Sequence, residues 1–224
     1  MIRVLGYCGF LERNGVVLPE NGVDGAPVNV LAENGLRVLW SDVNWPFDAN
    51  SLQRHAIEFH RVVHHVFAQT AVVPFRLLSL FENKEELRWL LQQNRGAFSA
   101  DLERLAGLVQ MECVSYFVPQ REEREATSGM QFMKQKAGMW KSLEEYSERV
   151  QDALATISRG VRIREVKYGR RLFVLVERGC EQQFRETVQG LPLPAGMKYR
   201  TSGPWPAAEF LSDSVKAPQV AGKR

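Results

Sequence analysis

The stretch VRIREVKYGRRLFVLVE, residues 161–177, decides the fold of the second half of the chain. Val161 to Tyr168 and Arg171 to Glu177 are rich in the β-branched and aromatic residues that favour strands. Gly169 lies between the two runs, where the chain needs a turn. The stretch therefore predicts two consecutive strands that pair through a turn at Gly169.

Two helices and two further strands flank this pair. The helices are predicted from Ser128 to about Ser158, where apolar residues recur at helical spacing, and from Cys180 to Leu191. The strands are predicted from Val109 to Val118 and from Met197 to Ser202. The resulting order, β-α-β-β-α-β, is the split βαβ or ferredoxin-like arrangement.

The first half of the chain has a different order. It predicts a strand from Ile2 to Phe10 and then a hairpin, in which Val28 to Ala32 and Leu36 to Val43 flank the turn signal Asn34-Gly35. The elements predicted after the hairpin are a helix from Ser51 to about Gln69, a strand from Ala71 to Leu80, a helix capped by Asn83, and a second helix after a break at Gly96.

These patterns predict an α+β protein with two domains. Residues 1–107 form an N-terminal mixed α+β domain, and residues 108–211 form a modified ferredoxin-like domain. The small, polar and basic residues 212–224 are expected to be a flexible tail.

The composition is that of an ordinary globular protein. Of the 224 residues, 45% are hydrophobic and 25% are charged, with a formal net charge of +3. Cys8, Cys113 and Cys180 are odd in number and lack C-x-x-C spacing, which predicts reduced, mostly buried thiols. The N-terminus lacks the pattern of a secretion signal, and Pro74 and Arg76 interrupt the most apolar stretch. We therefore expect a soluble, cytoplasmic protein.

Histidines on the first predicted helix are the main candidates for metal ligands. His60 and His64 lie four residues apart on one face, with His55 about a turn earlier and His65 alongside. Arg61 follows His60, so the H-E-x-x-H pattern is absent, and the sequence places no third ligand. No G-x-S-x-G, Walker or G-x-G-x-x-G motif occurs. We expect no metal, no cofactor and no enzymatic activity.

A ferredoxin-like sheet can also bind RNA, through aromatic residues on its central strands. Laid on the RNP1 pattern, Gly169 to Val176 keeps only Phe173 and Val174. Arg171 stands at a stacking position and Val176 at the final aromatic position, so the stacking platforms are missing. A nucleic-acid-binding module stays open as the alternative function, because the net charge is basic.

The first turns of the long predicted helix carry Met130, Met133, Ala137 and Trp140 in addition to the main apolar stripe. Met-rich, Trp-bearing faces adapt to apolar partners. Packing against the N-terminal domain would account for the same residues. The pattern thus indicates either a partner surface or an interface within the chain.

The stretch TSGPWPAAEF, residues 201–210, presents one large aromatic side chain. Pro204 and Pro206 hold Gly203 and Trp205 extended, which directs the Trp205 ring at little entropic cost. The ring either seals the last strand onto its own domain or anchors a partner.

Several motifs follow the order of the gas vesicle F/L protein family. Residues 201–210 are similar to the T-G-P-W-P-P-Y-S-F signature that closes proteins of this family, and Leu172 to Val176 resembles the apolar strand before their last helix. The other matching positions are Ser41-Asp42-Val43, His60 with Val63, Val73-Pro74-Phe75-Arg76, Ser128-Gly129 before Phe132, and Gly203-Pro204-Trp205-Pro206 with Phe210. The chain is identified as a divergent member of the family.

The resemblance implies a non-enzymatic accessory protein of gas vesicle formation, with two α+β domains of which the second is a modified ferredoxin-like fold. It also implies that the partners are the hydrophobic shell protein and other accessory proteins, at the growing vesicle and not at a membrane. A shell subunit with a very apolar face aggregates unless another protein covers that face. We expect Met130, Met133, Trp140 and Trp205 to make this contact.

Overall fold

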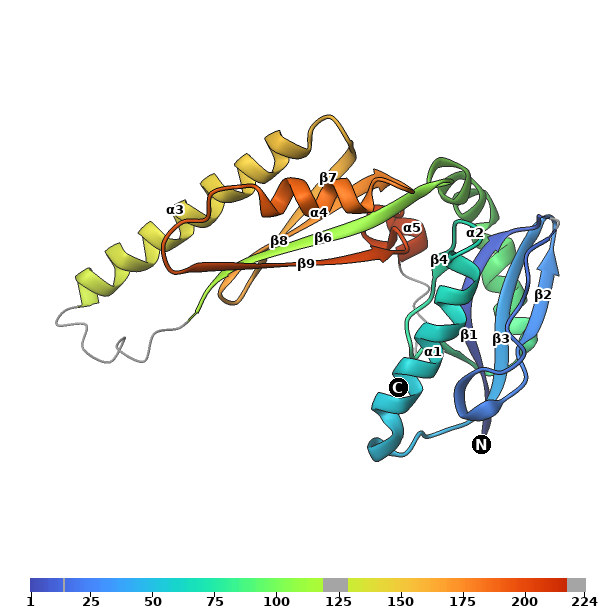
Figure 1. The fold of residues 1–224 in the computed structure, drawn as a ribbon. Coiled ribbons are helices and arrows are strands. Elements are labelled where there is room, and N and C mark those ends of the chain that lie inside the picture. Colours follow the sequence, from blue (N-terminus) through green and yellow to red (C-terminus); the bar gives the residue numbers. More distant parts are fainter. Residues whose placement is uncertain (14, 119–128, 217–224) are drawn as a thin grey trace. The chain divides into compact units, whose positions relative to one another are not determined.

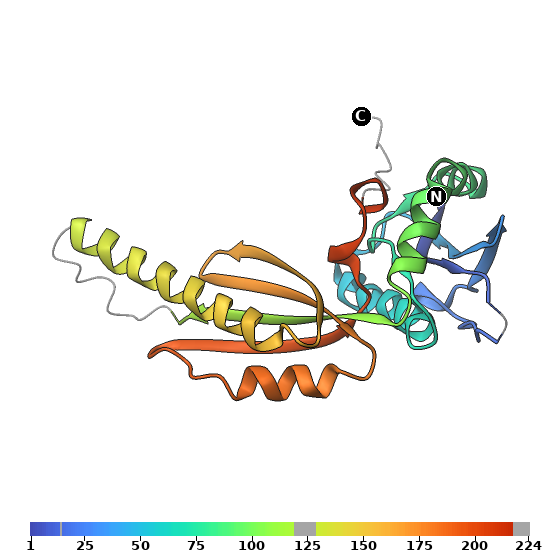
Figure 2. The same ribbon diagram turned by 90° about the horizontal axis from the view of Figure 1, so that it is seen from above.

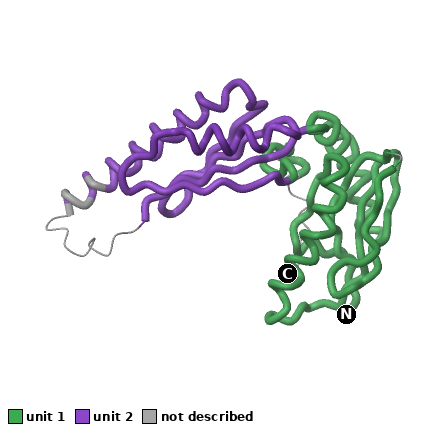
Figure 3. Tube along the Cα trace, viewed as in Figure 1, with its two compact units in different colours: residues 1–107, 206–224 green, residues 108–205 purple. Residues whose placement is uncertain are grey.

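The computed structural model describes residues 1–13, 15–118 and 129–216, which form two compact units (Figure 3). Unit 1 consists of residues 1–107 and 206–224, and unit 2 consists of residues 108–205. Residues 206–216 therefore group with the N-terminal part of the chain, although they follow unit 2 in the sequence. None of the described helices combines the length and apolarity that crossing a membrane requires.

Unit 1 is built on an antiparallel sheet with the strand order β2-β3-β1-β4, in which β5 also pairs with β1 (Figure 1). The turn between β2 and β3 is at Asn34 and Gly35, as predicted, and both have positive φ angles, of 48° and 85°. The strands are β1 (Ile2–Leu11), β2 (Asn29–Glu33), β3 (Leu36–Asn44), β4 (Val73–Pro74) and β5 (Leu80–Phe81).

Two long helices pack against the central strand of this sheet, α1 (Leu52–Phe67) and α2 (Lys84–Arg104). The seven consecutive residues Val4 to Phe10 of β1 are buried, so both faces of the strand are covered. As predicted, Asn83 caps α2, because its Oδ1 accepts a hydrogen bond from Glu86 N at 2.9 Å. The shorter helices of unit 1 are η1 (Val23–Gly25), η2 (Ala49–Ser51), η4 (Ala208–Phe210) and α5 (Asp213–Lys216).

Two predictions for unit 1 are wrong. The stretch from Ala71 to Leu80 is not one strand, since Pro74 lacks an N–H and Ser79 N donates to Arg76 O in a turn that separates β4 from β5. The helix does not break at Gly96 either. An exposed glycine costs a helix only about 1 kcal/mol relative to alanine, which the packing of α2 outweighs.

Unit 2 contains β6 (Leu108–Phe117), α3 (Gly129–Leu154), β7 (Ser158–Val166), β8 (Gly169–Glu177), α4 (Glu181–Gln189) and β9 (Met197–Trp205). Its four strands form an antiparallel sheet in the order β7-β8-β6-β9. α3 ends at Leu154 and not at Ser158, because Ser158 already pairs with Val176 in the sheet. The predicted α+β class is confirmed by both units.

The core of unit 2 lies between one face of this sheet and the two helices (Figure 2). α3 packs on β6 and β8, and α4 packs on β6 and β9. The buried side chains that form this core are Val109, Met111, Cys113, Leu143, Tyr146, Val150, Leu154, Leu172, Val174, Val176, Phe184 and Val188. On β6 and β8 they alternate with residues of the opposite face, as the period of a strand requires.

Candidate partner-binding site

The first turns of α3 run past the ends of the strands that the rest of the helix covers (Figures 1 and 2). Leu143, Tyr146 and Val150 in the second half of the helix are buried. In contrast, Met130 and Met133 are 71% and 65% exposed. We call residues 130–140 the α3 overhang. It presents flexible apolar side chains to solvent, and such groups adapt to an apolar partner.

Trp140 lies where the overhang meets the sheet. Its half-buried side chain lines a hollow of about 310 Å³ together with Glu144, Glu165 and Arg170. Arg170 Nη1 lies 3.7 Å from Glu144 Oε1, so an ion pair forms part of the wall. The hollow therefore combines an aromatic surface with charged groups, as many recognition sites do.

The closing motif makes a bulge in β9. Ser202 is opposite Glu112 and Trp205 is opposite Gln110, so β9 has one more residue than β6 between these pairs. Gly203 has a φ angle of 117°, and a Cβ there would lie 2.8 Å from Met111 Sδ. A glycine is required at this position. The strand also continues through the motif to Trp205, beyond the predicted end at Ser202.

Trp205 itself is half-buried, and its indole Nε1 donates to Ser202 Oγ at 3.3 Å within the same strand. The chain after Pro206 belongs to unit 1, where Phe210 is buried. Arg104 Nη2 donates to Phe210 O at 2.7 Å. The motif thus forms the bulge at the end of unit 2, and its last residue, Phe210, is held in unit 1 by the hydrogen bond from Arg104.

The remaining motif positions have different surroundings. Ser41 is fully buried and donates from Oγ to Pro27 O at 2.8 Å, and Pro74 pairs with Cys8 in the sheet. Asp42, His60 and Arg76 are exposed. Gly129 is the first residue of α3, while Ser128 and the side chain of Phe132 lie outside the described residues. Ser41 and Pro74 therefore have structural roles, whereas Asp42, His60 and Arg76 lie at the surface.

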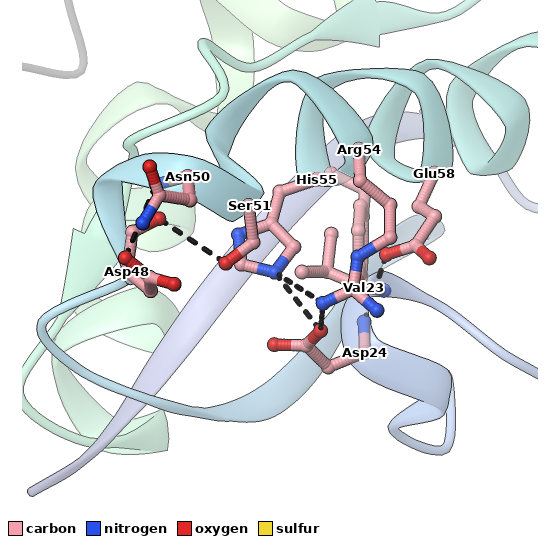
Figure 4. Close-up of polar contacts among 9 residues, drawn as sticks. Val23, Asp24, Asp48, Asn50, Ser51, Arg54, His55 and Glu58 are labelled. Carbon is pink, nitrogen blue, oxygen red and sulfur yellow. Dashed lines mark hydrogen bonds and ion pairs between the residues drawn. The ribbon is translucent and has the colours of Figure 1, made fainter.

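Among the described residues, the three side chains that could hold a metal ion are Asp24, His55 and Glu58 (Figure 4). Their ligand atoms lie within 4.8 Å of one another. His55 Nε2 is 2.9 Å from Asp24 Oδ1, and Arg54 Nη2 donates to the same oxygen at 2.6 Å. Asp24 N also donates to Glu58 Oε2 at 3.0 Å. The guanidinium already neutralises Asp24, so this cluster is explained as an anchor between η1 and α1.

The predicted pair of His60 and His64 is close, with ring centroids 5.7 Å apart, but it gathers no third ligand among the described residues. Burial and the neighbouring His64 lower the pKa of His60. Burial raises the pKa of the Cys8 and Cys113 thiols to about 12, so both are protonated at neutral pH. The predicted free, mostly buried cysteines are confirmed.

Comparison with known proteins identifies the family. A family model described as "Gas vesicle synthesis protein GvpL/GvpF" matches residues 6–212. The chain belongs to this family. The predicted family resemblance is therefore confirmed, and all of the motif positions lie within the matched range.

Individual members of the GvpL/GvpF family agree with this assignment. The chain is 26% identical over 248 aligned positions to "Gas vesicle protein L" of Streptomyces sp. (strain CB03234), covering 95% of this chain and 88% of the relative. The crystal structure of GvpF from Anabaena sp. PCC7120 matches with a TM-score of 0.76 at 15% identity, covering 94% of this chain and 96% of that one. GvpF from Microcystis aeruginosa matches with a TM-score of 0.71 at 16% identity, covering 91% and 96%. These structures share the fold.

Two features of the site region were not predicted. Trp89 on α2 is 60% exposed. The Asp24–His55 contact joins residues 31 positions apart in the sequence. A helical projection of α2 would have placed Trp89 on the face opposite the buried Leu87 and Leu91. The contact between Asp24 and His55 could not be predicted from the residues around either position.

Proposed function

We propose that this chain is a non-enzymatic accessory protein of gas vesicle formation that covers an apolar surface of the shell protein with its α3 overhang. Membership of the GvpL/GvpF family supports the gas vesicle role. The observation that carries the surface assignment is the exposure of Met130 and Met133 on the same helix as the half-buried Trp140. The proposed place of action is the cytoplasm, at the growing vesicle, with other accessory proteins as further partners.

Within this proposal unit 2 is a modified ferredoxin-like domain. The order of its elements and the strand order β7-β8-β6-β9 support this assignment, because both follow the split βαβ pattern. The overhang is then an extension of the first helix of that domain. A rigid helix supported by a sheet can present apolar side chains without needing a reactive group.

The physical basis is transient burial of apolar surface. An exposed methionine or tryptophan that becomes buried against a partner contributes about 25 cal/mol for each Å² removed from water. Trp140 lines a hollow at the base of the overhang, a position suited to an aromatic anchor. Trp205 is the second proposed anchor. Its bond to Ser202 means that its replacement has to be tested for stability as well as for binding.

The test compares two double variants in binding to purified shell protein and in suppression of shell protein aggregation. Met133→Gln with Trp140→Gln is expected to weaken binding about tenfold or more, which corresponds to about 1.4 kcal/mol. The matched control, Ile57→Gln with Trp89→Gln, changes side chains that are 57% and 60% exposed in unit 1 and is expected to bind like the wild type. Both variants should keep the thermal transition of the wild type.

Other outcomes have definite meanings. If the α3 variant bound normally and the control bound weakly, the binding surface would have to be assigned to unit 1. A wild-type chain that binds no gas vesicle protein would refute the proposed function.

A further inference from the structure

The sheet of unit 2 has one face against α3 and α4, and its opposite face is cationic. We call this opposite face the open face. Strand register places its residues, because directly paired residues point to the same side. On β7 and β8 they include Arg162, Arg164, Val166, Arg171, Phe173 and Leu175, and on β6 and β9 they include Gln110, Glu112, Val114, Tyr116, Lys198, Arg200, Ser202 and Trp205. Five of these side chains are basic and one is acidic.

Three arginines of the open face stand in one row across the sheet. Arg164 is directly opposite Arg171, which pairs on its other side with Val114, and Val114 pairs with Arg200. Like charges that face each other on adjacent strands destabilise a sheet. The row concentrates positive charge on the open face, and an anionic partner complements such a patch.

Phe173 stands beside this row on the open face, opposite Arg162 and Glu112, and is only 3% exposed. The guanidinium carbons of Arg164 and Arg171 lie 5.8 and 5.9 Å from the centroid of its ring. Arg171 Nε is buried without a hydrogen-bond partner among the described residues. The aromatic ring is used to position guanidinium groups and does not offer a stacking surface to a base.

We infer that the open face binds an extended acidic segment of a protein partner. Arg162 and Arg164 on β7, like Lys198 and Arg200 on β9, are exposed and two positions apart. Alternate residues of an extended chain repeat about every 6.6 Å, so carboxylates at alternate positions of a peptide match these cations. A nucleic acid is matched less well, because Phe173 is 3% exposed and offers its bases no stacking surface on this face.

This inference does not depend on the overhang or on the shell protein. It assigns a second surface to unit 2 and a partner of different chemistry. Electrostatic contacts at exposed sites weaken as salt is added, whereas binding through the apolar overhang does not. The two surfaces can therefore be distinguished by salt alone.

The experiment measures binding of a fluorescent peptide of alternating glutamate and serine to the full chain at low salt. A glutamine–serine peptide and a single-stranded oligonucleotide of the same formal charge serve as comparison ligands. Arg164→Glu with Arg200→Glu is expected to weaken acidic-peptide binding by about tenfold or more. The same variant should stay folded, with a thermal transition close to that of the wild type, because both positions are exposed.

The matched control is Arg61→Glu with Arg95→Glu, which changes two exposed arginines of unit 1 by the same total charge. It is expected to bind the acidic peptide like the wild type. Equal losses in both double variants would overturn the inference, because they would report net charge alone. Equal binding of the glutamine–serine peptide, or binding of the oligonucleotide without the acidic peptide, would overturn it as well.

Discussion

Tyr7 in unit 1 and Tyr146 in unit 2 are both fully buried, yet their hydroxyl groups have different surroundings. The Tyr7 hydroxyl accepts a hydrogen bond from Val23 N at 3.0 Å and is also hydrogen-bonded to Ser41. The Tyr146 hydroxyl has no hydrogen-bond partner among the described residues. Burial raises the pKa of both groups, to about 12 for Tyr146, while the hydrogen bonds of Tyr7 oppose that rise.

The difference extends beyond the two tyrosines. In unit 1, buried polar side chains hold segments that have no regular pairing of their own: Tyr7 holds η1, and Asp101 holds the returning C-terminal segment. In unit 2, Tyr146 lies in a core of strand and helix side chains that is otherwise mainly apolar. We therefore expect removal of a buried polar group to be costly in unit 1 and to be tolerated in unit 2.

The largest effect is expected for Asp101→Ala. The Asp101 carboxylate is nearly fully buried and accepts from Arg104 Nη2 at 2.6 Å and from Ser212 N at 2.7 Å. Loss of these two charge-assisted hydrogen bonds should lower the free energy of unfolding by about 3 kcal/mol, measured by urea denaturation. Asp152→Ala, at an exposed position of α3, should change it by less than about 0.5 kcal/mol.

Asp101→Asn sharpens this test, because the amide retains one acceptor and should recover part of the loss. Susceptibility of residues 206–216 to proteolysis should rise in the alanine variant and not in the Asp152 control. A stability of Asp101→Ala equal to that of the wild type would show that the carboxylate does not hold the returning segment.

Much of this fold was predictable because its signals are local and periodic. The strands around Gly169, the hairpin at Asn34-Gly35 and the cap at Asn83 each follow from a few neighbouring residues. The break predicted at Gly96 is absent, because tertiary packing stabilises the helix there although glycine disfavours it locally. Long-range polar contacts, such as that between Asp101 and Ser212, cannot be predicted from the local sequence around either residue.

The candidate site likewise combines features that the sequence predicts with features that only the structure shows. The apolar spacing of Met130, Met133 and Trp140 is visible in the sequence, and the structure adds that the first two are exposed and the third lines a hollow. The role of Gly203 could not be derived from the sequence, since the bulge depends on Met111 and Gln110 of another strand. The open face likewise requires the register of all four strands, because its arginines are spread over β7, β8 and β9.

An intermediate effect is expected for Tyr7→Phe. The substitution keeps the ring and removes the acceptor of the Val23 N–H, in a residue that is fully buried. An unsatisfied buried N–H costs about 1–2 kcal/mol, so the free energy of unfolding should fall by that amount. Hydrogen exchange at Val23 should accelerate more than exchange in unit 2. Unchanged stability and unchanged exchange at Val23 would contradict the role assigned to the hydroxyl.

The smallest effect, and the one of opposite sign, is expected for Tyr146→Phe. Because the hydroxyl is buried without a partner among the described residues, its removal takes away a desolvation cost and no hydrogen bond. The free energy of unfolding should rise by up to about 1 kcal/mol, which corresponds to about 2–4 °C in melting temperature for a chain of this size. Tyr168→Phe, on a side chain that is 53% exposed, is the matched control and should leave the melting temperature unchanged. A loss of stability in Tyr146→Phe as large as that in Tyr7→Phe would mean that the two buried tyrosines are equivalent, and the contrast between the units would fail.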